Sequence, residues 1–111
     1  MRQEFTDRLP EAAERFGTPL YAYDWLEVEE RWQALSAAFG EARVLYAMKA
    51  NPNLGLLKLM NALLGSGFEA VSGGELERAL AAGAPGERVA LNGPGKLPAD
   101  YARAREVGAT V

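Results

Sequence analysis

The sequence predicts an α/β fold built on a parallel sheet, and three observations support this prediction. From Val44 onward, short apolar segments alternate with helix-like segments in the order β-α-β-α-β-α-β. The strand centres, near Tyr46, Ala70 and Ala90, lie 24 and 20 residues apart. Short loops join these elements, and such alternation implies right-handed crossovers between parallel strands. A doubly wound sheet and a (β/α)₈ barrel both fit the pattern, and periodicity does not separate them.

The first 40 residues are predicted to form two helices flanking an extended segment. A short helix runs from Asp7 to Phe16 and stops at Gly17, and Thr18–Tyr23 has the composition of a strand. Asp24 then begins a longer helix that closes at Gly40. The apolar positions of this helix recur in steps of three and four; they are Trp25, Val28, Trp32, Leu35 and Phe39.

The first strand–helix unit follows. Val44–Met48 is a short apolar run without strict alternation, as expected of a strand buried on both faces of a parallel sheet. The next helix starts at Pro52 or Asn53 and presents a broad leucine-rich face up to Gly65.

The remaining elements repeat this plan. Phe68–Val71 is a second strand, and the pattern S-x-x-E at Ser72 begins a helix that ends at Gly83. A third strand, a further helix and the beginning of a fourth strand complete the chain; their predicted ranges are Arg88–Leu91, Pro98–Val107 and Ala109–Val111.

Composition excludes several kinds of chemistry. The 111 residues contain no Cys and no His, so a disulfide, a thiolate or imidazole metal site and a Ser–His couple are all excluded within the chain. The net charge of −3, with no basic block, argues against a nucleic-acid partner. There is no apolar run of about 18 residues and no signal-type start. We therefore expect a cytoplasmic protein without a membrane partner.

Lys49 is the first candidate functional residue. A lysine between a strand and a loop is usually a solvated surface residue. Lys49, however, ends a strand expected to be buried, at the end of a parallel sheet where ligands bind. Burial would lower the pKa of its amine and make it a Schiff-base nucleophile.

Two further features follow strands at the same end of the sheet, and a third lies within a strand. Ser72 with its two glycines is most simply a helix cap, and the alternative is an anion site at the helix start. The Asn92–Lys96 loop is turn-rich and would lie on the same rim as Lys49. Glu69 is a carboxylate within a predicted strand, so it is either a rim residue or the partner of a cation, and Lys49 is the nearest strand-end cation.

Three of these segments carry a family resemblance. Tyr46–Asn51, Gly67–Leu76 and Asn92–Lys96 resemble the N-terminal part of the diaminopimelate decarboxylases, which belong to the pyridoxal-phosphate decarboxylases with an alanine-racemase-like barrel. The motifs occur in the family's order, and the resemblance runs from about Phe16 to the end of the chain. Thr18–Asp24 resembles the family's opening strand and helix start.

The resemblance implies an incomplete (β/α)₈ barrel of about three to four units with parallel strands, preceded by a short helix and an extended N-terminal strand. In the family that strand joins a second, β-rich domain. The implied domains are therefore residues 1–24, which hold this helix and strand, and residues 25–111, the first part of the pyridoxal-binding barrel. The remainder of the barrel and the C-terminal domain are expected to be absent from this chain.

The resemblance also implies a cofactor and an activity. Pyridoxal 5'-phosphate would form a Schiff base with Lys49, and Glu69 and Ser72 would lie near the cofactor. Relatives often have Asp at the position of Glu69. The implied reaction converts meso-2,6-diaminopimelate to L-lysine and CO2 in lysine biosynthesis, by a homodimeric enzyme with a small amino-acid substrate.

A closed barrel takes roughly 250 residues, so we expect this chain to be an N-terminal portion of a longer enzyme. Alone, it is expected to be inactive and to self-associate. Three alternatives remain open: a decarboxylase of another basic amino acid or polyamine precursor, a racemase of the same barrel family, and a non-catalytic pyridoxal-phosphate-binding protein.

Overall fold

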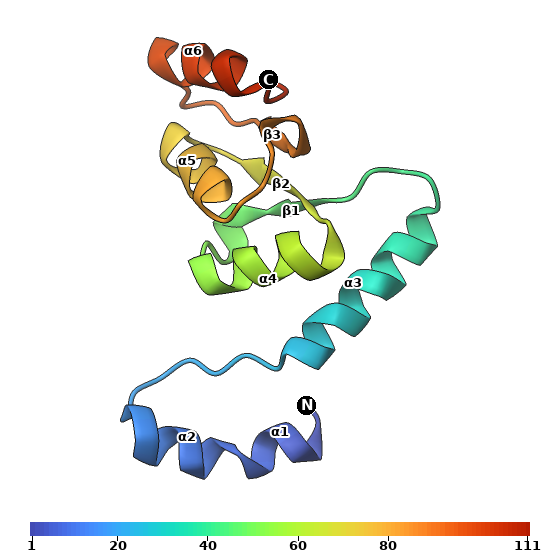
Figure 1. Cartoon of the computed structure of the whole chain (residues 1–111), viewed down its shortest axis with the longest axis vertical. Helices are drawn as coiled ribbons and strands as arrows, with labels where there is room; N and C mark the ends of the chain where they lie inside the picture. The colour runs from blue at the N-terminus through green and yellow to red at the C-terminus, as the bar shows by residue number, and fades with distance from the viewer. The chain divides into compact units, whose positions relative to one another are not determined.

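The computed structural model describes residues 1–111 without a gap, and the chain divides into two compact units, Met1–Gly40 and Glu41–Val111. The first unit is helical and the second is α/β (Figure 1). None of the helices combines the length and the hydropathy that a membrane span requires.

The first unit contains three helices, α1 (Gln3–Asp7), α2 (Leu9–Phe16) and α3 (Trp25–Phe39). The predicted first helix is confirmed as α2, with proline in its first turn and Gly17 at its end. Its start lies two residues later than expected, and α1 was not predicted. An ion pair between Arg2 and Glu30 joins the start of α1 to α3.

The prediction of a strand over residues 18–23 is wrong for this structure. These residues adopt no regular secondary structure and form no ladder. A strand is stabilised by hydrogen bonds to a neighbouring strand, and the first unit contains only helices. The β-favouring residue types of this segment therefore do not decide its structure.

Helix α3 begins and ends as the sequence predicts. The side chain of Asp24 accepts a hydrogen bond from the backbone N–H of Glu27 at 3.3 Å, and Gly40 follows the last helical residue. No residue of α3 is fully buried, and Leu35 and Phe39 on the predicted apolar stripe are exposed. Within its own unit the stripe is only partly covered.

The second unit is a three-stranded parallel sheet, which confirms the α/β class. Strands β1 (Leu45–Ala47), β2 (Gly67–Ala70) and β3 (Val89–Leu91) lie in the order β1-β2-β3. Ala47 pairs with Glu69, and Glu69 pairs with Ala90. β1 and β3 are shorter than their predicted ranges, whereas β2 has the predicted length and begins one residue earlier, at Gly67.

The helices of this unit are α4 (Leu54–Leu64), α5 (Gly73–Ala81) and α6 (Pro98–Val107). Two short 3₁₀ turns, η1 (Met48–Ala50) and η2 (Gly86–Arg88), flank the strands. The predicted helix starts at Asn53 and Ser72 are confirmed, because each side chain accepts a hydrogen bond from a backbone N–H in the first turn.

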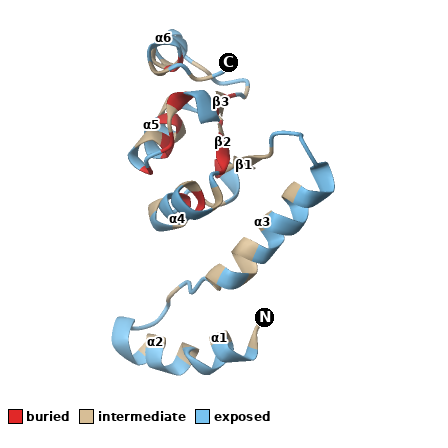
Figure 2. Ribbon diagram, turned by 45° about the vertical axis from the view of Figure 1, so that its right-hand side comes forward, coloured by how far each residue is buried: buried red, intermediate tan, exposed pale blue.

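One face of the sheet carries the core. Helices α4 and α5 lie on the same side of the strands, and buried residues gather where they meet the sheet (Figure 2). Strand side chains alternate between faces, so Phe68 and Ala70 point to this side while Glu69 points to the other. The largest side chains that are almost fully buried are Phe68, Met48, Leu57, Leu76, Leu91 and Val89.

The chain ends in the first contact of a fourth strand. Thr110 forms a parallel bridge with Ala90, with the N–H of Leu91 donating to the carbonyl of Thr110 at 2.7 Å. This single bridge agrees with the prediction that residues 109–111 begin a fourth strand, and it lies on the side of β3 away from β2.

Candidate functional site

Lys49 lies in the turn η1, directly after β1. Its neighbour Met48 is completely buried and anchors the turn, while Lys49 itself is exposed and has no hydrogen bond or ion pair. The expectation that Lys49 is desolvated is therefore wrong for this structure. Lys49 lies in the turn after β1, the strand at one end of the sheet, where a side chain can extend into solvent.

The loop that follows Lys49 is fixed by three hydrogen bonds. The hydroxyl of Tyr46 donates to the carbonyl of Asn51 at 3.2 Å, and Nη1 of Arg78 donates to the carbonyl of Pro52 at 3.0 Å. The N–H of Asn53 donates to Oδ1 of Asn51 at 3.1 Å. Strand β1 and helix α5 thus both hold the loop that directly follows the turn carrying the lysine.

Glu69 lies in the central strand, with its side chain on the face opposite α4 and α5. Its Oε1 accepts a hydrogen bond from Nδ2 of Asn92 at 3.2 Å, and it forms no ion pair with Lys49. Of the two alternatives for Glu69, the pairing with Lys49 is therefore wrong for this structure. An amide from the loop after β3 takes that place.

Ser72 begins α5, as its position in the sequence predicts. Its Oγ accepts a hydrogen bond from the N–H of Glu75 at 3.2 Å, and Oε2 of Glu75 accepts one from the N–H of Val71 at 2.8 Å. The carboxylate of Asp100 lies against Gly73, so closely that a Cβ at this position would collide with it. Two carboxylates thus stand at the N-terminus of α5, and they disfavour an anion there.

The three predicted residues lie at one end of the sheet, where the carboxyl ends of the strands are. Lys49 follows β1, Glu69 lies near the end of β2, and Ser72 follows β2. The sequence singled out the Asn92 loop by its place after the third strand, but the contact between Asn92 and Glu69 was not predicted. Asn92 lies two residues beyond Ala90, the register partner of Glu69, so the alternation of side chains places both on the same face of the sheet, and this diagonal relation is the signal that could have indicated the contact.

The side chains present at this edge fit an aldehyde cofactor. A primary amine condenses with an aldehyde, and Lys49 supplies such an amine with no competing partner. Glu69 supplies a carboxylate on the face of the sheet that α4 and α5 leave open. Because carboxylates occupy the N-terminus of α5, we assign the phosphate of the cofactor to no residue of this chain.

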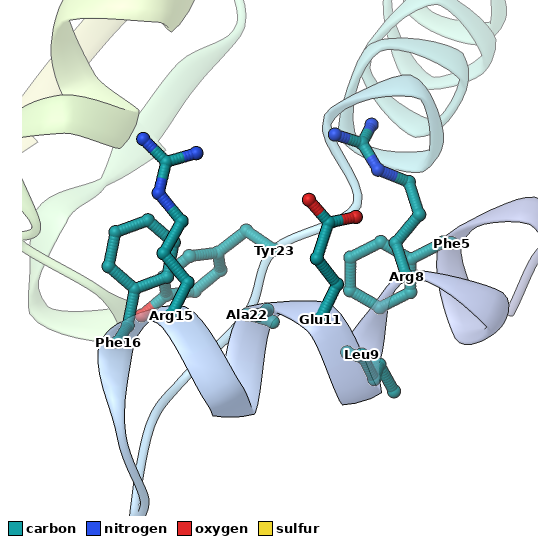
Figure 3. A pocket seen from close by; sticks show the side chains of 9 residues that line it. Phe5, Arg8, Leu9, Glu11, Arg15, Phe16, Ala22 and Tyr23 are labelled. Atoms are coloured by element: carbon teal, nitrogen blue, oxygen red, sulfur yellow. The ribbon is translucent and has the colours of Figure 1, made fainter.

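A separate hollow of about 270 Å³ lies in the first unit, between α2 and the segment before α3. Figure 3 shows Glu11 and Arg15 of α2, and Arg8 just before it, projecting to the same side, with the rings of Phe16 and Tyr23 beside Arg15. None of the residues predicted for the site lines this hollow, so it has no place in the candidate chemistry.

Comparison with known proteins gives the family to which the chain belongs. Residues 26–111 match the family described as pyridoxal-dependent decarboxylase, pyridoxal binding domain. The chain belongs to this family, and its cofactor is accordingly pyridoxal phosphate. This finding confirms the resemblance that the three sequence motifs indicated.

The individual relatives are more specific. The chain is 58% identical over 103 residues to the diaminopimelate decarboxylase of Deinococcus radiodurans, covering 93% of this chain and 27% of that protein. It is 47% identical over 98 residues to the enzyme of the same name from Pseudomonas fluorescens, covering 86% of this chain and 23% of that protein. The chain thus spans about a quarter of the length of these relatives.

Solved structures agree. The structure of AQ1208 from Aquifex aeolicus is similar with a TM-score of 0.85 and 44% identity, covering 91% of this chain and 25% of that one. Diaminopimelate decarboxylase from Helicobacter pylori, complexed with L-lysine, is similar with a TM-score of 0.81 and 35% identity, covering 91% of this chain and 26% of that one. Lysine/ornithine decarboxylase from Vibrio vulnificus, complexed with putrescine, is similar with a TM-score of 0.87 and 26% identity, covering 98% of this chain and 30% of that one.

Proposed function

We propose that this chain forms the first part of the cofactor barrel of a decarboxylase that converts meso-2,6-diaminopimelate to L-lysine and CO2. Residues 25–111 would supply the first three strand–helix units and the start of a fourth, and residues 1–24 would join a β-rich second domain. The whole enzyme would be a homodimer. The observation that carries the proposal is the amine of Lys49 in a braced turn at the carboxyl end of β1.

In this proposal Lys49 holds the cofactor covalently through Nζ. The hydrogen bonds from Tyr46 and Arg78 to the carbonyls of Asn51 and Pro52 keep the turn in place, so the amine is presented from a fixed backbone. Orientation of a reacting group by a rigid support is a major source of catalytic advantage.

When bound, pyridoxal phosphate supplies an electron sink for the carbanion left after loss of a carboxylate. The contribution of Glu69 is electrostatic. A carboxylate on the open face of β2 favours a positively charged group beside it, and its place in the central strand puts it between the units that carry Lys49 and Asn92. Ser72 would serve first as the cap of α5 and second as a cofactor contact.

Diaminopimelate is the proposed substrate because the relatives of 58% and 47% identity carry that enzyme's name. A decarboxylase of another basic amino acid is the second candidate. The structural similarity to the lysine/ornithine decarboxylase of Vibrio vulnificus supports this second candidate, although the sequence identity to that enzyme is lower.

Reductive trapping tests the role of Lys49. Borohydride treatment of the complete protein with pyridoxal phosphate should attach a reduced pyridoxyl group to the peptide that contains Lys49. The variant Lys49→Ala should lose this label, whereas Lys58→Ala, which removes an exposed lysine of α4, should retain it. A label on another lysine, or none, would refute the assignment.

Substrate choice is tested separately. The complete protein is expected to release CO2 from meso-diaminopimelate much faster than from L-lysine, L-ornithine or L-arginine. Preference for one of these three would favour the second candidate. Cofactor trapping without any release of CO2 would indicate a racemase or a non-catalytic carrier.

A further inference from the structure

We propose that Asn92 is a positioning residue that fixes the carboxylate of Glu69 for its task at the cofactor. The proposal rests on the function proposed above. Asn92 follows β3 and Glu69 lies in β2, so the contact joins two successive strand–helix units. It is the one hydrogen bond between side chains of neighbouring strand–loop segments at this edge that reaches a candidate site residue.

The orientation of the Asn92 amide is determined by two contacts. Its Oδ1 accepts a hydrogen bond from the N–H of Gly93 at 2.8 Å, which leaves Nδ2 to donate to Oε1 of Glu69 at 3.2 Å. An amide turned the other way would place an oxygen against the carboxylate and an NH2 group against an N–H. Both contacts therefore require the same orientation.

The loop that carries Asn92 is itself restrained. Gly93 has φ of +100°, which L side chains rarely adopt, and it lies against Val71. The ammonium group of Lys96 donates to the carbonyl of Gly93 at 2.7 Å and stands 5.5 Å from the centre of the Tyr101 ring. Asn92 thus projects from a fixed backbone rather than from a free loop.

A half-exposed glutamate needs such a restraint. Its side chain has three rotatable bonds, and fixing it costs conformational entropy. No ion pair holds Glu69, so the amide of Asn92 carries this role. Because an amide donor is neutral, it orients the carboxylate without cancelling its charge, and that charge remains available to a cationic group of the cofactor or substrate.

The variant Asn92→Asp tests the proposal with little change in shape. An aspartate can still accept from the N–H of Gly93, but it presents a second oxygen to Glu69 in place of the donor. The matched control is Asn53→Asp, which makes the same chemical change after β1. The Asn53 side chain acts only as an acceptor, from the N–H of Leu56, so aspartate can replace it there.

The first measurement uses the complete protein without cofactor. The side-chain NH2 resonances of Asn92 should shift in Glu69→Ala, while those of Asn61 on α4 should not. Resonances of Asn92 that do not change when Glu69 is removed would overturn the proposal. This readout needs neither bound cofactor nor activity.

The second measurement is a double-mutant cycle on the dissociation constant for pyridoxal phosphate. Asn92→Asp should weaken binding about tenfold in the wild-type background, and less than twofold in the Glu69→Ala background. Asn53→Asp should change binding less than twofold in both. An equal loss from Asn92→Asp in the two backgrounds would show that Asn92 acts only through its loop, which would overturn the proposal.

If Asn92→Asp does not fold, Asn92→Ala enters the same cycle with the same expected pattern. Failure of the proposed function has a different signature, since wild-type protein would then take up no reducible cofactor at Lys49. The two failures are therefore distinguishable.

Discussion

Gly86 packs directly against the backbone carbonyl of Val107. Gly86 is buried in the turn η2 that leads into β3, and Val107 is the last residue of α6. A Cβ at position 86 would overlap the carbonyl group of Val107. Since that group is backbone and not the end of a flexible side chain, the chain must shift to admit any other residue.

The variant Gly86→Ala is accordingly expected to destabilise the protein by about 1–3 kcal/mol, the usual cost of overpacking. Gly95→Ala is the matched control, because no atom lies within 4 Å of a Cβ there and its φ is not positive. Denaturant unfolding should show a lower midpoint for the first variant and a nearly unchanged one for the second. Equal midpoints would contradict this packing.

Ser72→Ala should lower the free energy of unfolding by about 1 kcal/mol, since the N-terminal turn of α5 loses its side-chain acceptor. Ser72→Thr should recover most of that loss, because its hydroxyl can still accept from the N–H of Glu75. Affinity for pyridoxal phosphate should fall as well, but by less free energy than the fold loses, because capping is the first proposed role of the hydroxyl and cofactor contact the second. An unchanged affinity in Ser72→Ala would contradict the second role.

Arg103 on α6 holds Glu77 on α5, with Nε to Oε1 at 2.6 Å. This hydrogen bond lowers the pKa of Glu77 below its ordinary value. A carboxyl group whose pKa is lowered in the folded state stabilises the fold at a pH above its pKa in the unfolded chain, about 4.3. This contribution is lost as the pH falls through the lower pKa of the folded state. Both side chains are substantially exposed, so the effect is modest and should shrink with added salt.

Thermal unfolding between pH 6 and pH 3 checks this expectation. The wild-type protein should lose more stability over that interval than Arg103→Gln does. Arg105→Gln, which removes an exposed arginine of the same helix without an ion pair, should follow the wild type. Parallel curves for the wild type and Arg103→Gln would contradict the assignment.

The 111-residue chain by itself should be inactive and should self-associate. Large apolar side chains are exposed in its first unit, among them Tyr21 at 92% and Phe16 at 70%, and β1 is an edge strand with unpaired backbone groups. Sedimentation velocity should show species larger than a monomer. A compact monomer would contradict the predicted self-association. Release of CO2 by the chain alone would contradict the predicted inactivity.

Local rules account for most of what the sequence predicted correctly. Helix starts depend on a cap within three residues and helix ends on a following glycine, so short windows of sequence contain the required information. The starts of α3, α4 and α5 and the ends of α2, α3, α4 and α6 were all located in this way; the capping residues are Asp24, Asn53 and Ser72, and the closing glycines are Gly17, Gly40, Gly65 and Gly108.

Three of the wrong predictions depended on contacts between distant segments. Residues 18–23 have strand-forming side chains, but a strand also needs a partner elsewhere in the chain. The exposure of Lys49 depends on what packs beside its turn, and the partner of Glu69 on a loop 23 residues away. No local pattern contains such information, although the register of parallel strands limits which residues of neighbouring strands can be contact partners.

The register of β2 has a consequence for how this protein can vary in evolution. Glu69 points to the open face only because Phe68 and Ala70 point to the core, so one residue inserted within the strand would exchange the two sets. The carboxylate would then enter the apolar layer and lose Asn92 at the same time. Differences in length among orthologues should therefore accumulate in the connections that precede the strands, and the spacing from Gly67 to Ser72 should remain constant.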